Sequence, residues 1–324
     1  MRLATLRDGS PDGQLLVVSR DGLRAIDARA AASSLRAALD DWPRVATSLL
    51  QLAAELDQGS PAAFELDLTA LAAPLPRAAE WVDGSAYLNH VRLVRRARNA
   101  APPATLETDP LVYQGGASDM LGPRDTFRLL NEAYGLDFEA ELGVVLGDTP
   151  QGTTAASAGA HVRLLVCLND WTYRNLVPVE LAKGFGFFCS KPATGFAPFA
   201  VTPDELGAAW KGGRLLGTMQ VALDGQRVGE VETGPEMHFS FFELVEHICK
   251  TRRFGAGTIL GSGTISNAAP ARGVSCLQEL RALETIASGA ANTPFLKVGS
   301  QVRISFRLAD GTTPFGEIQQ MVVA

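Results

Sequence analysis

Short apolar segments that alternate with turn sequences predict β-strands at both ends of the chain. The first apolar segments cover 1–6, 15–18 and 23–26, and two turn sequences, 10–13 and 21–22, separate them, which predicts a β-meander. The same signals predict later strands over 111–113, 218–223, 227–232, 258–262, 301–307 and 313–319. The chain is therefore expected to be rich in antiparallel β-structure.

Helical spacing of apolar residues interrupts this pattern in a few places. An Ala- and Leu-rich stretch over 28–56 predicts a helix that is broken at Pro43. A second helix is expected to open at Trp81, with Asp83 or Ser85 as its N-cap, and to carry the basic run that follows. The remaining helices are expected in the segment that ends at Lys183 and over 241–252.

One alternating stretch carries several carboxylates. In an extended strand, Asp137, Glu139 and Glu141 project to one face while apolar side chains project to the other. A second apolar run begins at residue 164 and ends in Asn169-Asp170, which adds a further carboxylate. The acidic face is either solvated, as in many amphipathic strands, or built around a cation. Oxygen ligands of this kind favour Mg²⁺ or Ca²⁺ over zinc.

A change of composition near Ala78 divides the chain into two predicted parts. With 324 residues, of which 46% are hydrophobic and 20% charged, the chain can form a substantial core in one large or two unequal domains. Residues 1–78 are predicted to form a small β-rich N-terminal domain and its linker. Residues 79–324 are predicted to form a larger domain of the α+β class, mostly β, with peripheral helices.

Charge and cysteine content narrow the class of protein. A net charge of −6 and a pI near 5.3 argue against a nucleic-acid partner. The four cysteines lack paired spacing, so we expect reduced thiols rather than disulfides or a zinc site. No apolar run reaches the ~18 to 20 residues that cross a bilayer, and the N-terminus lacks a signal core. We therefore expect a cytoplasmic protein without a membrane partner.

Several common functional motifs are missing or incomplete. The string 255–257, Gly-Ala-Gly, follows a helical segment and lacks the third glycine of a dinucleotide-binding turn. No Gly-x-Ser-x-Gly string is present, so a nucleophile elbow has no support. The histidines at 161, 238 and 247 have no metal-ligand spacing and are expected to be ordinary hydrogen-bonded or surface residues.

A series of polar residues carries a family resemblance through its order and spacing. An aspartate with a histidine seven residues later precedes a Tyr-x-Gly-x-Ala-Ser string, a Glu-x-Glu strand, an Asn-Asp-x-x-x-Arg string, a lysine, a Gly-Thr-Ile-Ser turn and a glutamate. In this sequence the elements are Asp83, His90, 113–118, Glu139, Glu141, 169–174, Lys191, 263–266 and Glu279. Together they resemble the fumarylacetoacetate hydrolase family, in its bacterial type, over nearly all of 80–320.

This resemblance implies a fold, an assembly and an activity. The family fold is a mixed β-sandwich or β-roll catalytic domain behind a small β-rich N-terminal domain, and its members are usually homodimers. The implied activity is the metal-dependent hydrolysis of a carbon–carbon bond in a 1,3-diketo acid. The first candidate substrate is fumarylacetoacetate, from tyrosine and phenylalanine catabolism. The resemblance implies that one Mg²⁺ or Ca²⁺ is bound by Asp83, Glu139, Glu141 and Asp170.

The resemblance also implies roles for residues around the metal. His90, paired with Glu279, is expected to act as general base on water. Lys191 and Arg174 are expected to neutralise oxyanion charge. The alternatives are that these two cations balance the acidic cluster and that Glu279 pairs with Arg281 or another neighbour on the surface. The residues implied in substrate binding are Tyr113, Arg98 and Thr264.

The sequence departs from the family pattern at two positions and leaves rival activities open. Ser85 and Val177 stand where the animal enzymes have a tyrosine and a glutamine, and the glutamine helps to form an oxyanion site, a role that Asn175 is the candidate to take over. Acylpyruvate or fumarylpyruvate hydrolysis, decarboxylation, hydration and isomerisation are alternative family activities. Possession of both His90 and Glu279 favours a hydrolase over a decarboxylase, which needs no external nucleophile. A non-catalytic protein that binds a divalent metal or an organic acid is the rival from another class.

Overall fold

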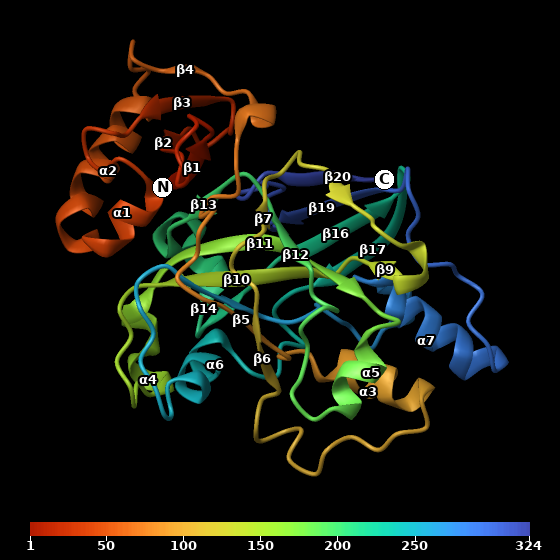
Figure 1. Cartoon of the computed structure of the whole chain (residues 1–324). Coiled ribbons are helices and arrows are strands. Elements are labelled where there is room, and N and C mark those ends of the chain that lie inside the picture. The colour runs from red at the N-terminus through yellow and green to blue at the C-terminus, as the bar shows by residue number, and fades with distance from the viewer.

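Two β-sheets with short helices around them form the structure, a computed structural model that describes residues 1–324 (Figure 1). The larger sheet has 13 strands. Their order is β4 (Phe64–Glu65), β3 (Arg24–Asp27), β2 (Gln14–Val18), β1 (Arg2–Leu6), β13 (Ala200–Val201), β11 (Val162–Tyr173), β10 (Ala140–Leu146), β18 (Thr258–Gly261), β5 (Trp81–Gly84) and β6 (Val112–Gly115), with β12 (Ala193–Phe196), β7 (Met120–Leu121) and β9 (Leu136–Asp137) off this path.

The second sheet has five strands, and both sheets contain parallel and antiparallel pairs. Its order is β17 (Gln226–Glu232), β16 (Thr218–Leu223), β19 (Gln301–Arg307), β20 (Glu317–Val323) and β8 (Phe127–Arg128). A small ribbon pairs β14 (Trp210–Lys211) with β15 (Arg214–Leu215). The predicted fold class, α+β and mostly β with mixed sheets, is confirmed.

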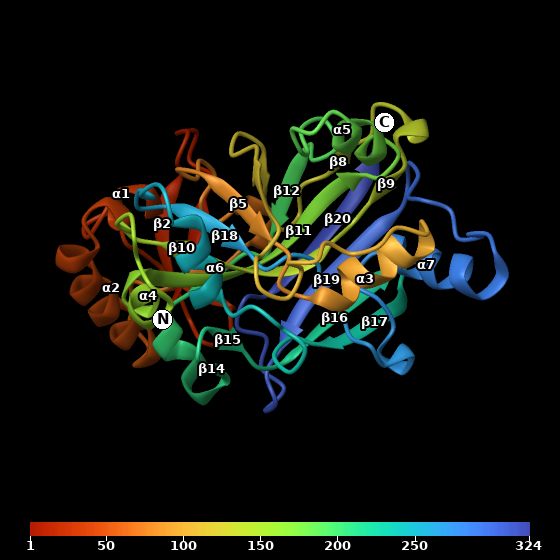
Figure 2. The ribbon, with the colours of Figure 1, turned by 90° about the horizontal axis from the view of Figure 1, so that it is seen from below.

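Seven α-helices and five short 3₁₀ turns surround the sheets. The helices are α1 (Leu35–Asp40), α2 (Trp42–Asp57), α3 (Leu88–Ala97), α4 (Ala155–Ala158), α5 (Val177–Ala182), α6 (Phe241–Ile248) and α7 (Leu277–Ser288). The turns are η1 (Leu68–Ala70), η2 (Glu132–Tyr134), η3 (Gly159–His161), η4 (Pro203–Ala209) and η5 (Pro270–Arg272). Seen from below, α3 and α7 lie side by side at one edge of the molecule (Figure 2). None of the helices has the length and apolar character needed to cross a membrane.

The N-terminal meander extends the larger sheet. Strands β1, β2 and β3 pair in antiparallel order, as predicted. Leu3 of β1 then pairs with Ala200 of β13, which joins the meander to β11. Helices α1 and α2 pack on this part, and their buried Leu35 and Leu49 share a core with Leu164 of β11. The predicted division of the chain at residue 78 stays a prediction.

The acidic stretch forms two strands with a break between them. β9 ends at Asp137, β10 begins at Ala140, and Ala140 lies opposite Asn169 in the antiparallel pair of β10 with β11. Every residue from 136 to 146 is buried, including all of its carboxylates. The alternative of a solvated acidic face is therefore excluded.

The helix expected to open at Trp81 begins later. Trp81 starts strand β5, which pairs in parallel with β18, and α3 begins only at Leu88 after the N-cap residue Tyr87. Neither Asp83 nor Ser85 caps that helix. The prediction was wrong because burial of this segment in the sheet outweighs its local helical spacing.

Other boundaries also differ from the prediction. The break in the first helical stretch lies at Asp41, and Pro43 sits in the first turn of α2, where its missing N–H is not needed. Strand β20 covers Glu317–Val323 rather than 313–319, and α7 was not predicted at all. All four cysteines are free thiols; Cys189 is exposed and the others are buried.

Candidate active site

Three carboxylates from separate strands converge within the larger sheet. Asp83 ends the part of β5 that pairs with β18, Glu141 lies on β10 beside β18, and Asp170 lies on β11. Their ligand oxygens all lie within 4.8 Å of one another, and all three residues are buried. The structure thus brings together three of the four residues expected to bind a metal.

The chemistry of this cluster fits a divalent cation. Burial, together with the charge of Asp170, raises the pKa of Asp83 to about 8. Burial and the neighbouring Asp83 also raise the pKa of Glu141 well above its usual value. Both carboxylate oxygens of Glu141 are buried without a hydrogen-bond partner. Mg²⁺ and Ca²⁺ prefer clustered carboxylate oxygens as ligands, and the Glu141 oxygens have no other partner, so the residues present fit the expected ion.

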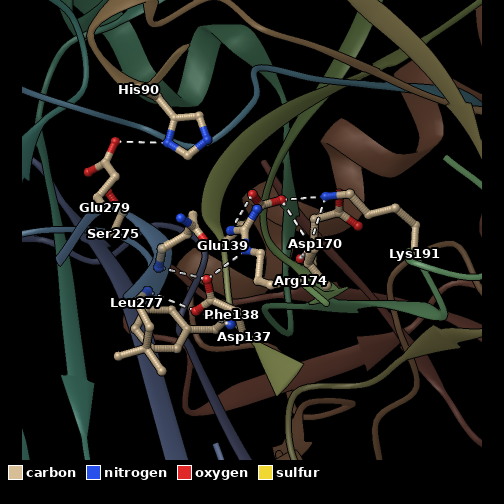
Figure 3. Close-up of polar contacts among 12 residues, drawn as sticks. His90, Asp137, Phe138, Glu139, Asp170, Arg174, Lys191, Ser275, Leu277 and Glu279 are labelled. Carbon is tan, nitrogen blue, oxygen red and sulfur yellow. Dashed lines mark hydrogen bonds and ion pairs between the residues drawn. The ribbon is translucent and has the colours of Figure 1, made fainter. Parts of the chain in front are cut away.

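Glu139 lies beside the cluster but is held by two cationic side chains (Figure 3). Arg174 Nη2 lies 2.7 Å from Glu139 Oε1, and the Lys191 ammonium donates to Glu139 Oε2 and, at 2.6 Å, to Asp170 Oδ2. Although burial opposes it, Arg174, Lys191 and His90 hold the pKa of Glu139 well below its usual range. Asp170 and Glu139 in turn outweigh burial and raise the pKa of Lys191. The role of Glu139 as a metal ligand stays a prediction, since Lys191 would have to leave that oxygen.

A histidine and a carboxylate meet where α3 packs on α7. His90 Nδ1 lies 2.9 Å from Glu279 Oε1, and Glu279 is buried while His90 is partly accessible. The carboxylate can only accept a hydrogen bond, which places the proton on Nδ1 and leaves Nε2 free to take up a proton. Arg281 instead donates to the carbonyl of Thr293, so the alternative pairing of Glu279 with Arg281 is excluded.

The expected substrate-binding residues lie at different distances from the cluster. The Tyr113 hydroxyl donates to Asp170 Oδ2, and burial and that carboxylate raise the pKa of Tyr113. Thr264 is buried in the loop after β18, next to Gly263, whose N–H donates to Asp83 Oδ1 at 2.9 Å. Arg98 is exposed just past the end of α3.

Sequence reasoning missed or left open several residues of the site. Thr172 Oγ1 accepts a hydrogen bond from Lys191 at 2.8 Å, and its position two residues after Asp170 on one strand is the signal that could have found it. Cys276 is buried within 4.8 Å of the ligand atoms of the His90 and Glu279 pair, but no local pattern pointed to it.

An apolar residue, Val177, occupies the position where the animal enzymes have a glutamine. Val177 is buried in the first turn of α5. The amide of Asn175, which could have taken over the glutamine's role, donates to the carbonyl of Ala133 at 2.9 Å. Its donor group is therefore engaged at the turn η2 rather than at the carboxylate cluster.

Two protein-family models match nearly the whole chain, and known proteins match parts of it. Residues 80–323 match the family described as fumarylacetoacetate (FAA) hydrolase C-terminal, and residues 1–77 match fumarylacetoacetase N-terminal domain 2. A 2,4-didehydro-3-deoxy-L-rhamnonate hydrolase of Sphingomonas sp. (strain SKA58) is 27% identical over 166 residues, which cover 49% of this chain and 54% of the relative. A mitochondrial oxaloacetate tautomerase of Homo sapiens is 33% identical over 104 residues, 30% of this chain and 32% of the relative.

A solved structure shares the fold at low sequence identity. The crystal structure of maleylpyruvate hydrolase from Sphingobium sp. SYK-6, in complex with manganese(II) ion and pyruvate, matches with a TM-score of 0.67 and 16% identity. The match covers 100% of this chain and 99% of the other. At this identity the likeness shows the fold and nothing finer.

Proposed function

Because the chain belongs to the fumarylacetoacetate hydrolase family, we propose that it hydrolyses a carbon–carbon bond in a 1,3-diketo acid with the help of a divalent cation. The observation that carries this proposal is the hydrogen-bonded pair of His90 and Glu279 in the same site as a buried carboxylate cluster, since such a pair can serve as the general base on water. Fumarylacetoacetate, which would yield fumarate and acetoacetate in tyrosine and phenylalanine catabolism, is the first candidate substrate. Fumarylpyruvate and other acylpyruvates are the next.

The cation is assigned to Asp83, Glu141 and Asp170, with Glu139 as the further ligand that the sequence pattern predicts. When bound, a divalent cation polarises the diketone oxygens and stabilises the negative charge of the departing enolate. Mg²⁺ or Ca²⁺ suits this all-oxygen donor set. The maleylpyruvate hydrolase of the same fold contains manganese(II), which also accepts oxygen ligands.

In the proposed reaction, His90 moves the proton of the attacking water. Its Nε2 accepts that proton as the water oxygen bonds to the substrate carbonyl carbon, while Nδ1–H stays hydrogen-bonded to Glu279. The carbon–carbon bond then breaks, its electron pair passes to the enolate, and the imidazolium returns the proton to the leaving carbon. Glu279 stabilises the transient imidazolium, and Lys191 and Arg174 supply positive charge beside the reacting oxygens.

Tautomerisation or decarboxylation of a short oxo acid is the second candidate. The 33% identity to an oxaloacetate tautomerase over 104 residues supports it. Such a reaction moves a proton or releases CO₂ but needs no nucleophilic water. The pairing of His90 with Glu279 supplies a general base that decarboxylation does not need, so it favours hydrolysis over decarboxylation, whereas tautomerisation would use the same pair to move a proton.

A substrate panel tests the two candidates against each other. The purified protein would be incubated with fumarylacetoacetate, fumarylpyruvate, acetylpyruvate and oxaloacetate, each with Mg²⁺ or Ca²⁺ and with EDTA, and products would be separated by chromatography. We expect cleavage of at least one diketo acid that EDTA abolishes. His90→Ala should lose this cleavage yet keep metal binding. Failure to cleave any of the diketo acids would overturn the proposal, and enol–keto conversion of oxaloacetate without cleavage would favour the second candidate.

We also propose that the active protein is a cytoplasmic homodimer. Support for the dimer comes from Phe185 and Phe188, which follow α5 and leave 98% and 85% of their surface exposed. Burial of such side chains between two copies would remove apolar surface from water. Sedimentation velocity should show a dimer that the double variant Phe185→Ser, Phe188→Ser weakens. A monomeric wild-type protein at micromolar concentration would contradict this proposal.

A further inference from the structure

Asp137 is a buried carboxylate that the proposed chemistry does not use. It links the start of α7, which carries Glu279, to Arg174, which contacts Glu139 (Figure 3). Asp137, at the end of β9, is 0% exposed. Its Oδ1 accepts the backbone N–H groups of Phe138 at 2.9 Å and Leu277 at 2.8 Å. Its Oδ2 accepts the N–H of Gln278 at 2.9 Å and Arg174 Nε at 2.8 Å. Both oxygens act as acceptors throughout, as an ionised carboxylate requires.

The first group of contacts that Asp137 makes is with the N-terminus of α7. Leu277 and Gln278 are the first two residues of that helix, and Glu279 is the third. The first N–H groups of a helix have no partner inside it, and the N-cap residue here, Cys276, offers no side-chain hydrogen bond. Asp137 supplies the missing acceptor from a distant strand, and its negative charge suits the helix dipole. The carboxylate therefore fixes the backbone that leads directly into Glu279.

The second contact of Asp137 is with the guanidinium of Arg174. The guanidinium places Nε on Asp137 and Nη2 on Glu139, at 2.8 Å and 2.7 Å, so the two carboxylates fix its plane. Arg174 directly follows the last residue of β11, whereas Glu279 comes from α7. One carboxylate thus sets the position of both elements relative to each other.

We propose that Asp137 is a positioning residue of this active site. It holds α7 so that Glu279 meets His90 Nδ1, and it orients Arg174 toward Glu139, without touching substrate itself. The kinetic part of this inference rests on the proposed hydrolysis, whereas its structural part does not. Because a misplacement of about 1 Å can reduce a rate by about 10²-fold, loss of this carboxylate should act through geometry.

A double-mutant cycle separates positioning from general damage. Asp137→Asn keeps the size of the side chain but replaces one accepting oxygen by an NH₂ group. Because all four contacts of Asp137 are hydrogen-bond donors, this NH₂ group has no acceptor there. We expect kcat to fall about 10- to 100-fold with KM little changed. In the Glu279→Gln background the same substitution should have a smaller effect, since Glu279, one of the two residues that Asp137 positions, is already impaired. Independent, multiplying effects of the two substitutions would overturn the inference.

Ser240→Ala serves as the matched control for loss of a helix cap. Ser240 caps α6, where its Oγ accepts the N–H of Glu243, and α6 carries no residue of the site. This variant loses a cap of comparable kind and should keep kcat. An equal fall of kcat in the Ser240→Ala and Asp137→Asn proteins would show that destabilisation alone is responsible, and the inference would fail.

A second readout does not depend on turnover. The chain has four histidines, so ¹⁵N-histidine labelling gives few signals, and comparison with His90→Ala assigns that of His90. In the metal-free protein we expect a hydrogen-bonded Nδ1–H signal that is lost in Glu279→Gln, shifted or lost in Asp137→Asn, and retained in Ser240→Ala. An unchanged signal in Asp137→Asn would overturn the inference even if the wild type cleaves diketo acids. A changed signal in a protein that cleaves none would sustain the structural inference while the proposed function fails.

Discussion

At the scale of single residues, the buried carboxylates differ in how their charge is balanced. Asp137 and Glu139 each contact the guanidinium of Arg174, and Glu139 also contacts Lys191. Glu141, in contrast, has neither a cationic partner nor a hydrogen bond on its oxygens. An isolated buried carboxylate is strongly unfavourable. The affinity of the site for a cation should therefore depend most on Glu141, whose oxygens have no other partner.

The first prediction concerns that residue. Glu141→Gln should weaken the binding of Mg²⁺ by at least about tenfold, because it removes the charge of a carboxylate that has no other compensation. Isothermal titration calorimetry of the EDTA-treated protein measures this affinity. Glu55→Gln, which changes an exposed glutamate of α2, is the matched control and should bind like the wild type. An unchanged affinity in Glu141→Gln would remove this residue from the metal site.

The second prediction follows from the raised pKa values of the cluster. Burial and Asp170 raise the pKa of Asp83 from 3.8 to about 8, so between these values the folded protein holds a proton that the unfolded chain releases. The free energy of unfolding of the metal-free protein should therefore fall as the pH rises from about 4 to about 8. Calorimetry in EDTA at several pH values checks this slope. The decrease of stability with pH should be smaller in the Asp83→Asn protein and in the wild-type protein with Mg²⁺ bound. A Tm of the metal-free wild type that rises between about pH 4 and about pH 8 would contradict the prediction.

At the scale of elements, local signals identified some segments and not others. Strands β16 and β19 match their predicted bounds because alternation and turn residues are properties of neighbouring positions. Helix α7 was missed; its N-terminal N–H groups are capped by Asp137, 140 positions earlier in the chain, and its own N-cap residue, Cys276, is not one of the usual capping residues. The order of motifs could predict that Asp83, Glu141 and Asp170 meet, and it left open that Arg174 and Lys191 balance the acidic cluster. It could not predict that both cations contact Glu139, since that depends on side-chain packing.

The third prediction concerns the segment that leads into Lys191. The carboxylate of Glu180 on α5 accepts the backbone N–H groups of Phe188, Cys189 and Ser190 and the hydroxyl of Ser190. Glu180→Gln replaces one accepting oxygen by a donor, so the segment should loosen. We expect faster chymotrypsin cleavage after its phenylalanines and lower turnover.

The control for this experiment is another glutamate that accepts a backbone N–H from outside its own helix. Glu246 on α6 accepts the N–H of Ala155 at 2.6 Å, away from the carboxylate cluster. Glu246→Gln should leave both the cleavage rate of the 185–188 segment and the turnover close to those of the wild type. Equal cleavage of all three proteins would mean that Glu180 does not hold this segment.

At the scale of the whole molecule, the N-terminal part shares its core with the strands that carry the site. A cluster of 24 buried residues includes Leu15 of β2 and Leu49 of α2 together with Leu164 of β11 and Phe196 of β12. The red and orange segments of Figure 1 accordingly adjoin the strands that cross the centre of the picture. β11 also carries Asp170, so packing of the N-terminal helices supports the same strand that presents a carboxylate to the cluster.

The fourth prediction tests whether residues 1–78 unfold as a separate domain. Leu49→Ala removes a side chain that is 0% exposed and should cost about 2–5 kcal/mol of stability. Because the shared core and the β1–β13 pairing join the two parts, scanning calorimetry should show one transition, shifted as a whole to lower temperature. Leu50→Ala, at a neighbouring position of α2 that is 47% exposed, should shift it far less. Two transitions, of which Leu49→Ala lowers only one, would instead mean that the N-terminal part is an independent folding unit despite the continuous sheet.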